Sequence, residues 1–139
     1  MDRDLFYLNK AYIEALKAYD KNEIPVGVII VKDDKIISKA HNLRDLKQIV
    51  TKHAEIIAIE KANKKLNNWR LNDCVLYSTL EPCDMCSEVI NEAKIQKVIY
   101  GANNQNKTNK YKFEQISDKK TIKKCEQLIK NKFIELRNK

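Results

Sequence analysis

Residues 73–101 read DCVLYSTLEPCDMCSEVINEAKIQKVIYG, and their pattern of apolar and polar residues predicts a strand, a helix and a strand. The apolar run of residues 73–80 predicts a buried strand that ends at Glu81-Pro82. Pro82 is suited to the first position of a helix over residues 83–93. Residues 95–101 are apolar again and predict the next strand. A strand, a helix and a strand in this order favour parallel pairing through a right-handed crossover.

The rest of the chain adds elements on both sides of this unit. Apolar spacings of three and four predict helices, and short apolar runs between polar turns predict strands. The expected elements are a helix over 4–19, a hairpin of strands over 26–31 and 35–40, a polar connection over 42–51, a helix over 53–66, a loop over 103–109 and a helix over 121–137. Residues 1–139 are therefore expected to form a single α/β domain with a three-layer α/β/α architecture and a mixed central sheet.

The composition is that of an ordinary globular protein, with 43% hydrophobic and 33% charged residues. No apolar run approaches the ~20 residues that a membrane span needs, and the N-terminal sequence does not resemble a signal peptide. We therefore expect a cytoplasmic protein. The formal charge of +8 suits a polyanionic partner such as nucleic acid. A lysine- and asparagine-rich composition can equally come from an AT-rich coding sequence, so the charge alone leaves the partner open.

Two of the four cysteines form a close pair. Cys83 and Cys86 are three residues apart, so one helical turn brings both sulfurs to the same face. The start of a helix also favours thiolates, because its free N–H groups and positive dipole end stabilise negative charge. The pair is therefore expected to bind a metal ion. Cys74 and Cys125 are isolated and are expected to be packing residues.

His53-Ala54-Glu55 opens the other central helix. With Cys83 and Cys86, His53 makes a Cys₂His set that leaves a tetrahedral zinc one open position, as in catalytic sites. Zinc in such a site lowers the pKa of bound water toward ~7. Glu55 is two residues from His53 and does not share its face, so we expect it to move protons between that water and the substrate. His-x-Glu followed by Pro-Cys-x-x-Cys is the signature of zinc nucleobase deaminases.

The sequence resembles the bacterial tRNA-specific adenosine deaminases, within the zinc-dependent cytidine and deoxycytidylate deaminase superfamily. The segments that carry the resemblance are EIPVG at 23–27, Asn42, HAEI at 53–56, WRL at 69–71, LYSTLEPCDMC at 76–86, VIYGA at 98–102 and FIELR at 133–137. The resemblance implies a cytidine-deaminase-like fold, one Zn²⁺ per subunit and a homodimer. It also implies conversion of adenosine to inosine at the first (wobble) anticodon position of tRNA, with the anticodon stem-loop bound near the subunit interface.

The resemblance further implies a pocket for the flipped-out base. Asn42 matches the residue that recognises the base, and its amide can both donate and accept hydrogen bonds. Ile24, Pro25, Ala54 and Leu80 match residues of the pocket wall. Without the resemblance, an asparagine after a strand is a turn residue. Ile24, Pro25 and Leu80 are then equally consistent with the core.

The loop over 103–109 departs from the family pattern. Family members usually carry an aspartate-lysine-glycine loop after the fourth strand, whereas NNQNKTN has neither aspartate nor glycine. In the family this loop touches the nucleotides that flank the target. Lys107, Lys110 and Lys112 are expected to be solvated surface residues, with phosphate contacts as the alternative.

Two other functions remain open. A deaminase of a free base or nucleoside, of the guanine or cytosine/cytidine type, would share the metal ligands and Glu55 and differ in its pocket. A non-catalytic subunit that binds RNA beside an active deaminase would commonly lack the carboxylate of Glu55. The charge of +8 and the run over 79–86 favour the RNA deaminase.

Overall fold

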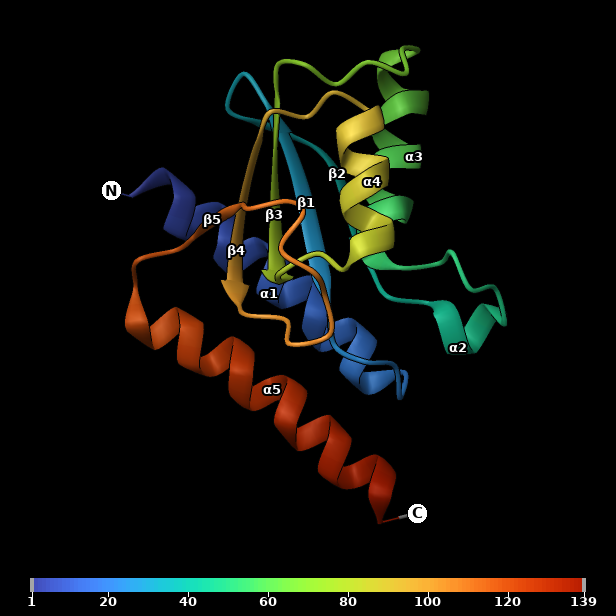
Figure 1. Ribbon diagram of the computed structural model, residues 1–139, viewed down its shortest axis with the longest axis vertical. Helices are drawn as coiled ribbons and strands as arrows, with labels where there is room; N and C mark the ends of the chain where they lie inside the picture. Colours follow the sequence, from blue (N-terminus) through green and yellow to red (C-terminus); the bar gives the residue numbers. More distant parts are fainter. Residues whose placement is uncertain (1, 139) are drawn as a thin grey trace.

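A computed structural model describes residues 2–138 (Figure 1). Within them, the strands form one sheet in the order β2-β1-β3-β4-β5. The strands are β1 (Gly27–Lys32), β2 (Lys35–His41), β3 (Cys74–Leu80), β4 (Lys97–Ala102) and β5 (Glu114–Gln115). The helices are α1 (Arg3–Asp20), α2 (Arg44–Lys47), α3 (Ala54–Leu66), α4 (Asp84–Glu92) and α5 (Lys119–Arg137).

The sheet is mixed, as the sequence predicts. β1 is antiparallel to both β2 and β3, and β3 is parallel to β4 through the crossover helix α4. The β1–β2 turn places Asp33 and Asp34 at φ 51° and 61°, a left-handed conformation that aspartate tolerates in tight hairpins. The sequence did not predict β5, which pairs parallel to β4, or α2, which lies in the expected polar connection. Both elements are too short to show a periodicity.

Helices cover both faces of the sheet, which confirms the three-layer α/β/α fold. The strand β1 alternates between the layers: Val28 and Ile30 face α3 and α4, whereas Ile29 faces α1. In Figure 1, α3 and α4 lie side by side on one face, and α5 runs diagonally past the lower end of the sheet, where it contacts β4. Ile122 of α5 packs on the α1 side of the sheet. No helix within residues 2–138 is long and apolar enough to cross a membrane.

Two glycines allow helices to approach the sheet closely. A Cβ atom on Gly27 would lie 2.0 Å from the carbonyl oxygen of Ala11 and 2.4 Å from the backbone nitrogen of Ala15. A Cβ atom on Gly101 would lie 2.8 Å from Sγ of Cys125. Any side chain at Gly27 would push α1 away, because the obstructing atoms belong to the helix backbone.

Cys74 and Cys125 are buried, which confirms that they are packing residues. Burial raises the pKa of both thiols, that of Cys125 to about 12. Neither thiol therefore ionises near neutral pH.

Candidate metal centre and adjoining pocket

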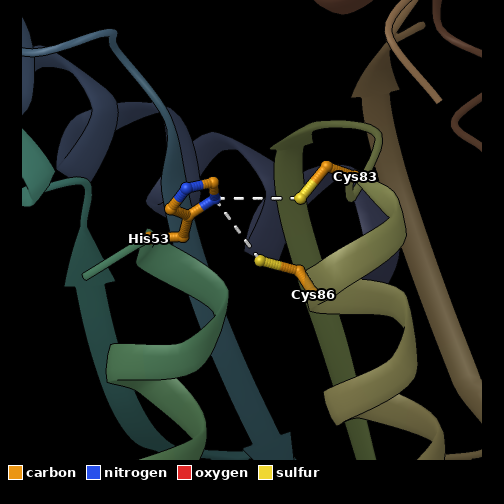
Figure 2. Close-up of side chains that lie close together, drawn as sticks. All are labelled: His53, Cys83 and Cys86. Atoms are coloured by element: carbon orange, nitrogen blue, oxygen red, sulfur yellow. Dashed lines mark hydrogen bonds between the residues drawn. The ribbon is translucent and has the colours of Figure 1, made fainter. Parts of the chain in front are cut away.

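Two helices begin beside each other at one end of the sheet. His53 is the N-cap of α3 and Cys83 is the N-cap of α4, both with extended backbone. Neither side chain caps its own helix, and both point into the space between the helices (Figure 2). The expectation that Pro82 takes the first helical position is wrong. Because Cys83 is extended, with ψ 174°, α4 begins only at Asp84.

The three predicted ligands converge on one point. Nδ1 of His53 lies 3.5 Å from Sγ of Cys86 and 3.8 Å from Sγ of Cys83 (Figure 2). A tetrahedral ion with Zn–S and Zn–N bonds of ordinary length separates its nitrogen and sulfur ligands by about 3.6 Å. The donor types and their spacing therefore fit one metal ion. Within residues 2–138, no other group of three histidine, cysteine or acidic side chains gathers in this way.

The surroundings favour ionisation of Cys83. Its pKa is lowered to about 4, mainly by a hydrogen bond from the Cys86 thiol and further by His53. The pKa of His53 is raised, chiefly by its hydrogen bond with Cys83. A thiolate is the form of cysteine that binds metal. The pocket therefore presents an anionic ligand at the start of α4, where the helix dipole stabilises it.

Glu55 lies in the first turn of α3 and outside the ligand group. Its side chain is buried and lines the same pocket as His53 and Cys83. Burial raises the pKa of its carboxyl to about 7. A carboxyl with that pKa can accept and release a proton at neutral pH, as a general acid–base group must.

A cavity of about 100 Å³ adjoins the ligand group. Beside His53, Glu55 and Cys83, its lining residues are Ile24, Val26, Asn42, Arg44, Ala54, Leu80, Glu81 and Asn104. The structure thus brings four of the five expected pocket residues to the cavity. The fifth, Pro25, is buried and does not line it. Its neighbours Ile24 and Val26 both face the cavity, and successive side chains of an extended chain point to opposite sides.

Asn42 combines the turn role and the expected pocket position. Its Nδ2 donates to the carbonyl oxygen of Ile24 at 3.2 Å, and its Oδ1 accepts from the backbone N–H of Arg44 at 3.2 Å. An amide carries two N–H donors and two acceptor lone pairs. One donor and one lone pair of Asn42 therefore remain for a ligand in the cavity.

Glu23 is a site residue that sequence reasoning missed. It is fully buried, and its carboxylate accepts from the backbone N–H groups of Asp45 at 3.0 Å and Leu46 at 2.5 Å. These bonds anchor the start of α2, so Glu23 holds Arg44 at the edge of the cavity. The sequence does offer one signal: Glu23 is a charged residue directly before the apolar run that begins at Ile24. A carboxylate buried with such a run needs hydrogen-bond donors from elsewhere in the chain.

The side chain of Lys107 is largely covered, and the expectation that it is solvated is wrong. Its side chain is 7% exposed, and its Nζ lies 3.1 Å from Oε2 of Glu81. Lys110 is exposed and pairs with Glu88 at 2.6 Å, and Lys112 is exposed too. The loop over 103–109 forms neither helix nor strand, as expected.

Comparison with known proteins agrees with this geometry. The profile of the MafB19-like deaminase family matches residues 2–137. A tRNA-specific adenosine deaminase of Streptococcus pyogenes serotype M18 is 46% identical over 105 residues, which are 76% of this chain and 66% of that relative. This chain thus spans just under two thirds of that relative's length.

Two solved structures share the fold at 28% and 29% sequence identity. One comes from a study of A-to-I editing by tRNA:A34 deaminases at the wobble position of transfer RNA. It superposes with a TM-score of 0.80 at 28% sequence identity, and the match covers 89% of this chain and 99% of that chain. The other is a guanine deaminase of Bacillus subtilis, with a TM-score of 0.70 at 29% sequence identity. This match covers 94% of this chain and 95% of the guanine deaminase. The fold, the His-Cys-Cys group and these relatives agree, and the chain belongs to the MafB19-like deaminase family, with tRNA-specific adenosine deaminases among its relatives.

Proposed function

We propose that this protein is a zinc-dependent enzyme that deaminates adenosine to inosine at the first (wobble) anticodon position of tRNA. The observation that carries the proposal is the convergence of His53, Cys83 and Cys86 beside the buried carboxyl of Glu55. The 46% identity to a tRNA-specific adenosine deaminase supports the choice of substrate. The reaction adds water at C6 of adenine and releases ammonia.

His53, Cys83 and Cys86 would hold one Zn²⁺ per subunit. Zinc, when bound, makes water acidic enough to act as a nucleophile near pH 7. The three protein ligands leave one coordination position for that chemistry. The low pKa of Cys83 supports this assignment, because the ligand is then ionised before a metal arrives.

Glu55 would move the protons of the reaction. The attacking water must lose a proton, while a ring nitrogen and then the leaving amine must each gain one. A single carboxyl with a pKa near 7 can serve each transfer, because it accepts and releases protons at the same pH. The burial of Glu55 in the cavity wall places it beside the metal ligands without making it one of them.

The adenine base would bind in the cavity beside the metal centre. Asn42 has one N–H and one lone pair left to pair with the base edge. Ile24, Ala54 and Leu80 line the cavity and provide apolar surface for the ring faces. A flipped-out base is held in this way, by polar contacts at its edge and apolar contacts at its faces.

The anticodon stem-loop would be the macromolecular partner, and the charge of +8 supports binding to its phosphates.

We further propose a homodimer. Leu46, Ile49 and Val50 are exposed close together in the segment beside the cavity, as residues of an interface would be. Because tRNA is the proposed substrate, we also propose that the protein is cytoplasmic. The family match over residues 2–137 supports a single deaminase domain.

A free-base deaminase of the guanine type is the second candidate. The likeness to the guanine deaminase of Bacillus subtilis, which covers 95% of that chain, favours it. Such an enzyme would use the same metal ligands and Glu55, so only the substrate separates the two candidates. The presence of Glu55 in the cavity disfavours a non-catalytic RNA-binding subunit.

The deciding experiment measures inosine formation on an anticodon stem-loop with adenosine at the first anticodon position. Free adenosine, cytidine and guanine are assayed in parallel, and Glu55→Gln protein prepared in the same way controls for contaminating deaminases. Inosine in the stem-loop alone supports the proposal. Turnover of guanine or a free nucleoside alone contradicts the tRNA substrate and keeps the zinc chemistry.

A further inference from the structure

Lys107 forms a partly buried ion pair that links the loop over 103–109 to the segment that carries Cys83. Its Nζ lies 3.1 Å from Oε2 of Glu81, with the two side chains 7% and 12% exposed. Nζ also donates to the carbonyl oxygen of Tyr111 at 3.4 Å. Buried charges are tolerated when their partners satisfy them, and truncating one partner leaves the other charge uncompensated.

Other contacts tie the same two segments together. Oε1 of Glu81 accepts from the backbone N–H of Asn104 at 3.1 Å, and the carbonyl oxygen of Glu81 accepts from the Asn104 side chain at 3.2 Å. Further along the loop, the backbone N–H and hydroxyl of Thr108 both donate to Asp84 at 3.0 Å. In Figure 1 this loop (orange) crosses the carboxyl end of β3. Two acidic residues outside the loop, Glu81 and Asp84, therefore anchor it.

The anchored loop forms one wall of a larger groove. This groove, of about 760 Å³, continues from the cavity past His53 and Cys83. The consecutive amide residues 103–106 line one side, and Lys130 and Phe133 of α5 line the other. Amides can donate to and accept from base edges, and an exposed aromatic ring can stack on an unpaired base. The groove therefore has the chemistry to hold nucleotides on either side of a base in the cavity.

We propose that Lys107 is a positioning residue for substrate selection. Its pair with Glu81, hereafter the latch, fixes the amides of residues 103–106 along the groove and so determines which nucleotides are accepted beside the target adenosine. Lys107 acts through the loop and does not contact the RNA. The inference rests on the proposed function and extends it to the residues that read the sequence around the target.

The test compares three variants. Lys107→Met removes the charge and keeps the length of the side chain, Lys107→Arg keeps the charge, and Lys112→Met is the matched control at an exposed lysine of the same region. The kcat and KM are measured on stem-loops that differ only in the nucleotides beside the target. For Lys107→Met we expect KM to rise about tenfold, by more than kcat falls, and the preference among flanking nucleotides to flatten. Lys107→Arg restores most of the preference, and Lys112→Met keeps the wild-type values.

A second readout does not depend on activity. Amide hydrogen exchange, followed by NMR, reports on the N–H groups of Asn104 and Thr108, which donate to Glu81 and Asp84. Lys107→Met should accelerate exchange at both, while Lys112→Met leaves it unchanged. If the exchange rates of both N–H groups are unchanged in folded Lys107→Met protein, the proposal that the latch holds the loop is overturned. If Lys107→Met protein loses zinc but keeps the wild-type preference among flanking nucleotides, the proposed role of Lys107 in nucleotide selection is overturned.

The two readouts also separate this inference from the proposed function. If the wild type does not act on any stem-loop, the proposed function fails and the role in nucleotide selection fails with it. Faster exchange in Lys107→Met protein still supports the latch in that case. If the wild type edits the stem-loops and Lys107→Met protein keeps the wild-type KM and flanking preference, the selection role alone is overturned.

Discussion

Nδ1 of His53 lies 3.5 Å from Sγ of Cys86, although the two residues are 33 positions apart in the chain. The separation is the one expected for two ligands of a single tetrahedral ion. It arises because α3 and α4 pack side by side on one face of the sheet and begin at the same end. A metal ion held by these residues would therefore link the two helices, and metal binding would be coupled to their packing.

Removing a cysteine ligand should abolish metal binding. Cys86→Ala leaves two protein ligands, and we expect zinc content to fall to near zero and the Tm to fall with it. Elemental analysis of purified protein and thermal unfolding with and without a chelator measure both effects. Cys74→Ala is the matched control, since Cys74 is buried outside the ligand group and its loss should affect stability alone. Full zinc occupancy in Cys86→Ala protein would refute the ligand assignment.

Glu55→Gln should keep zinc and lose activity. The amide has nearly the same shape but cannot carry the proton, so we expect kcat to fall by at least ~10²-fold. The measurement is single-substrate kinetics on zinc-loaded protein, with metal content determined on the same sample. Glu60→Gln is the control, because Glu60 is exposed on the same helix. A Glu55→Gln enzyme of near wild-type rate would show that another group moves the proton.

Gly27→Ala should destabilise the fold through α1. The added methyl group would meet the backbone of Ala11 and Ala15, which cannot move without shifting the helix. We expect a loss of about 3 kcal/mol in the free energy of unfolding, at the upper end for overpacking. Gly101→Ala should cost less, because its obstacles, Sγ of Cys125 at 2.8 Å and the carbonyl oxygen of Thr79 at 2.9 Å, lie farther away than those at Gly27. Urea denaturation measures both, and equal effects would argue against the close approach of α1 at Gly27.

Glu14 should make stability depend on pH. Burial alone raises the pKa of its carboxyl, but hydrogen bonds from Lys17 at 2.7 Å and His41 at 3.2 Å outweigh this and lower it. Since the folded-state pKa lies below the unfolded-state pKa of about 4.5, the carboxylate stabilises the fold above that pH. This contribution is lost as the pH falls through the folded-state pKa.

Glu14→Gln should therefore lower the free energy of unfolding by roughly 2 kcal/mol at pH 7. The difference from wild type should shrink as the pH falls below about 4.5. Urea denaturation across this range measures it, with Glu92→Gln as an exposed control on α4. A difference that stays constant with pH would mean that the carboxylate charge is not what stabilises the fold.

Elements with a clear local pattern were predictable, and elements held by distant partners were not. The strand-helix-strand unit is predictable because each of its apolar runs is contiguous in the sequence. The helix α2 depends on the carboxylate of Glu23, which lies some twenty positions before it. The strand β5 has two residues and exists through its pairing with β4. No periodicity in their own residues marks these two elements.

The sequence predicted His53, Cys83 and Cys86 as ligands, the order of the main elements and the mixed sheet, because each motif and each apolar run behind these predictions is local, even though the segments that carry them are far apart in the chain. The folded structure alone shows that Pro25 does not line the cavity and that the Asn42 amide uses half its hydrogen-bonding capacity on the backbone of Ile24 and Arg44. The pairing of Lys107 with Glu81, which covers most of the lysine side chain, also appears only in the folded structure. Exposure, charge pairing and hydrogen bonding depend on neighbours that folding brings from other segments, and a local pattern does not specify those neighbours.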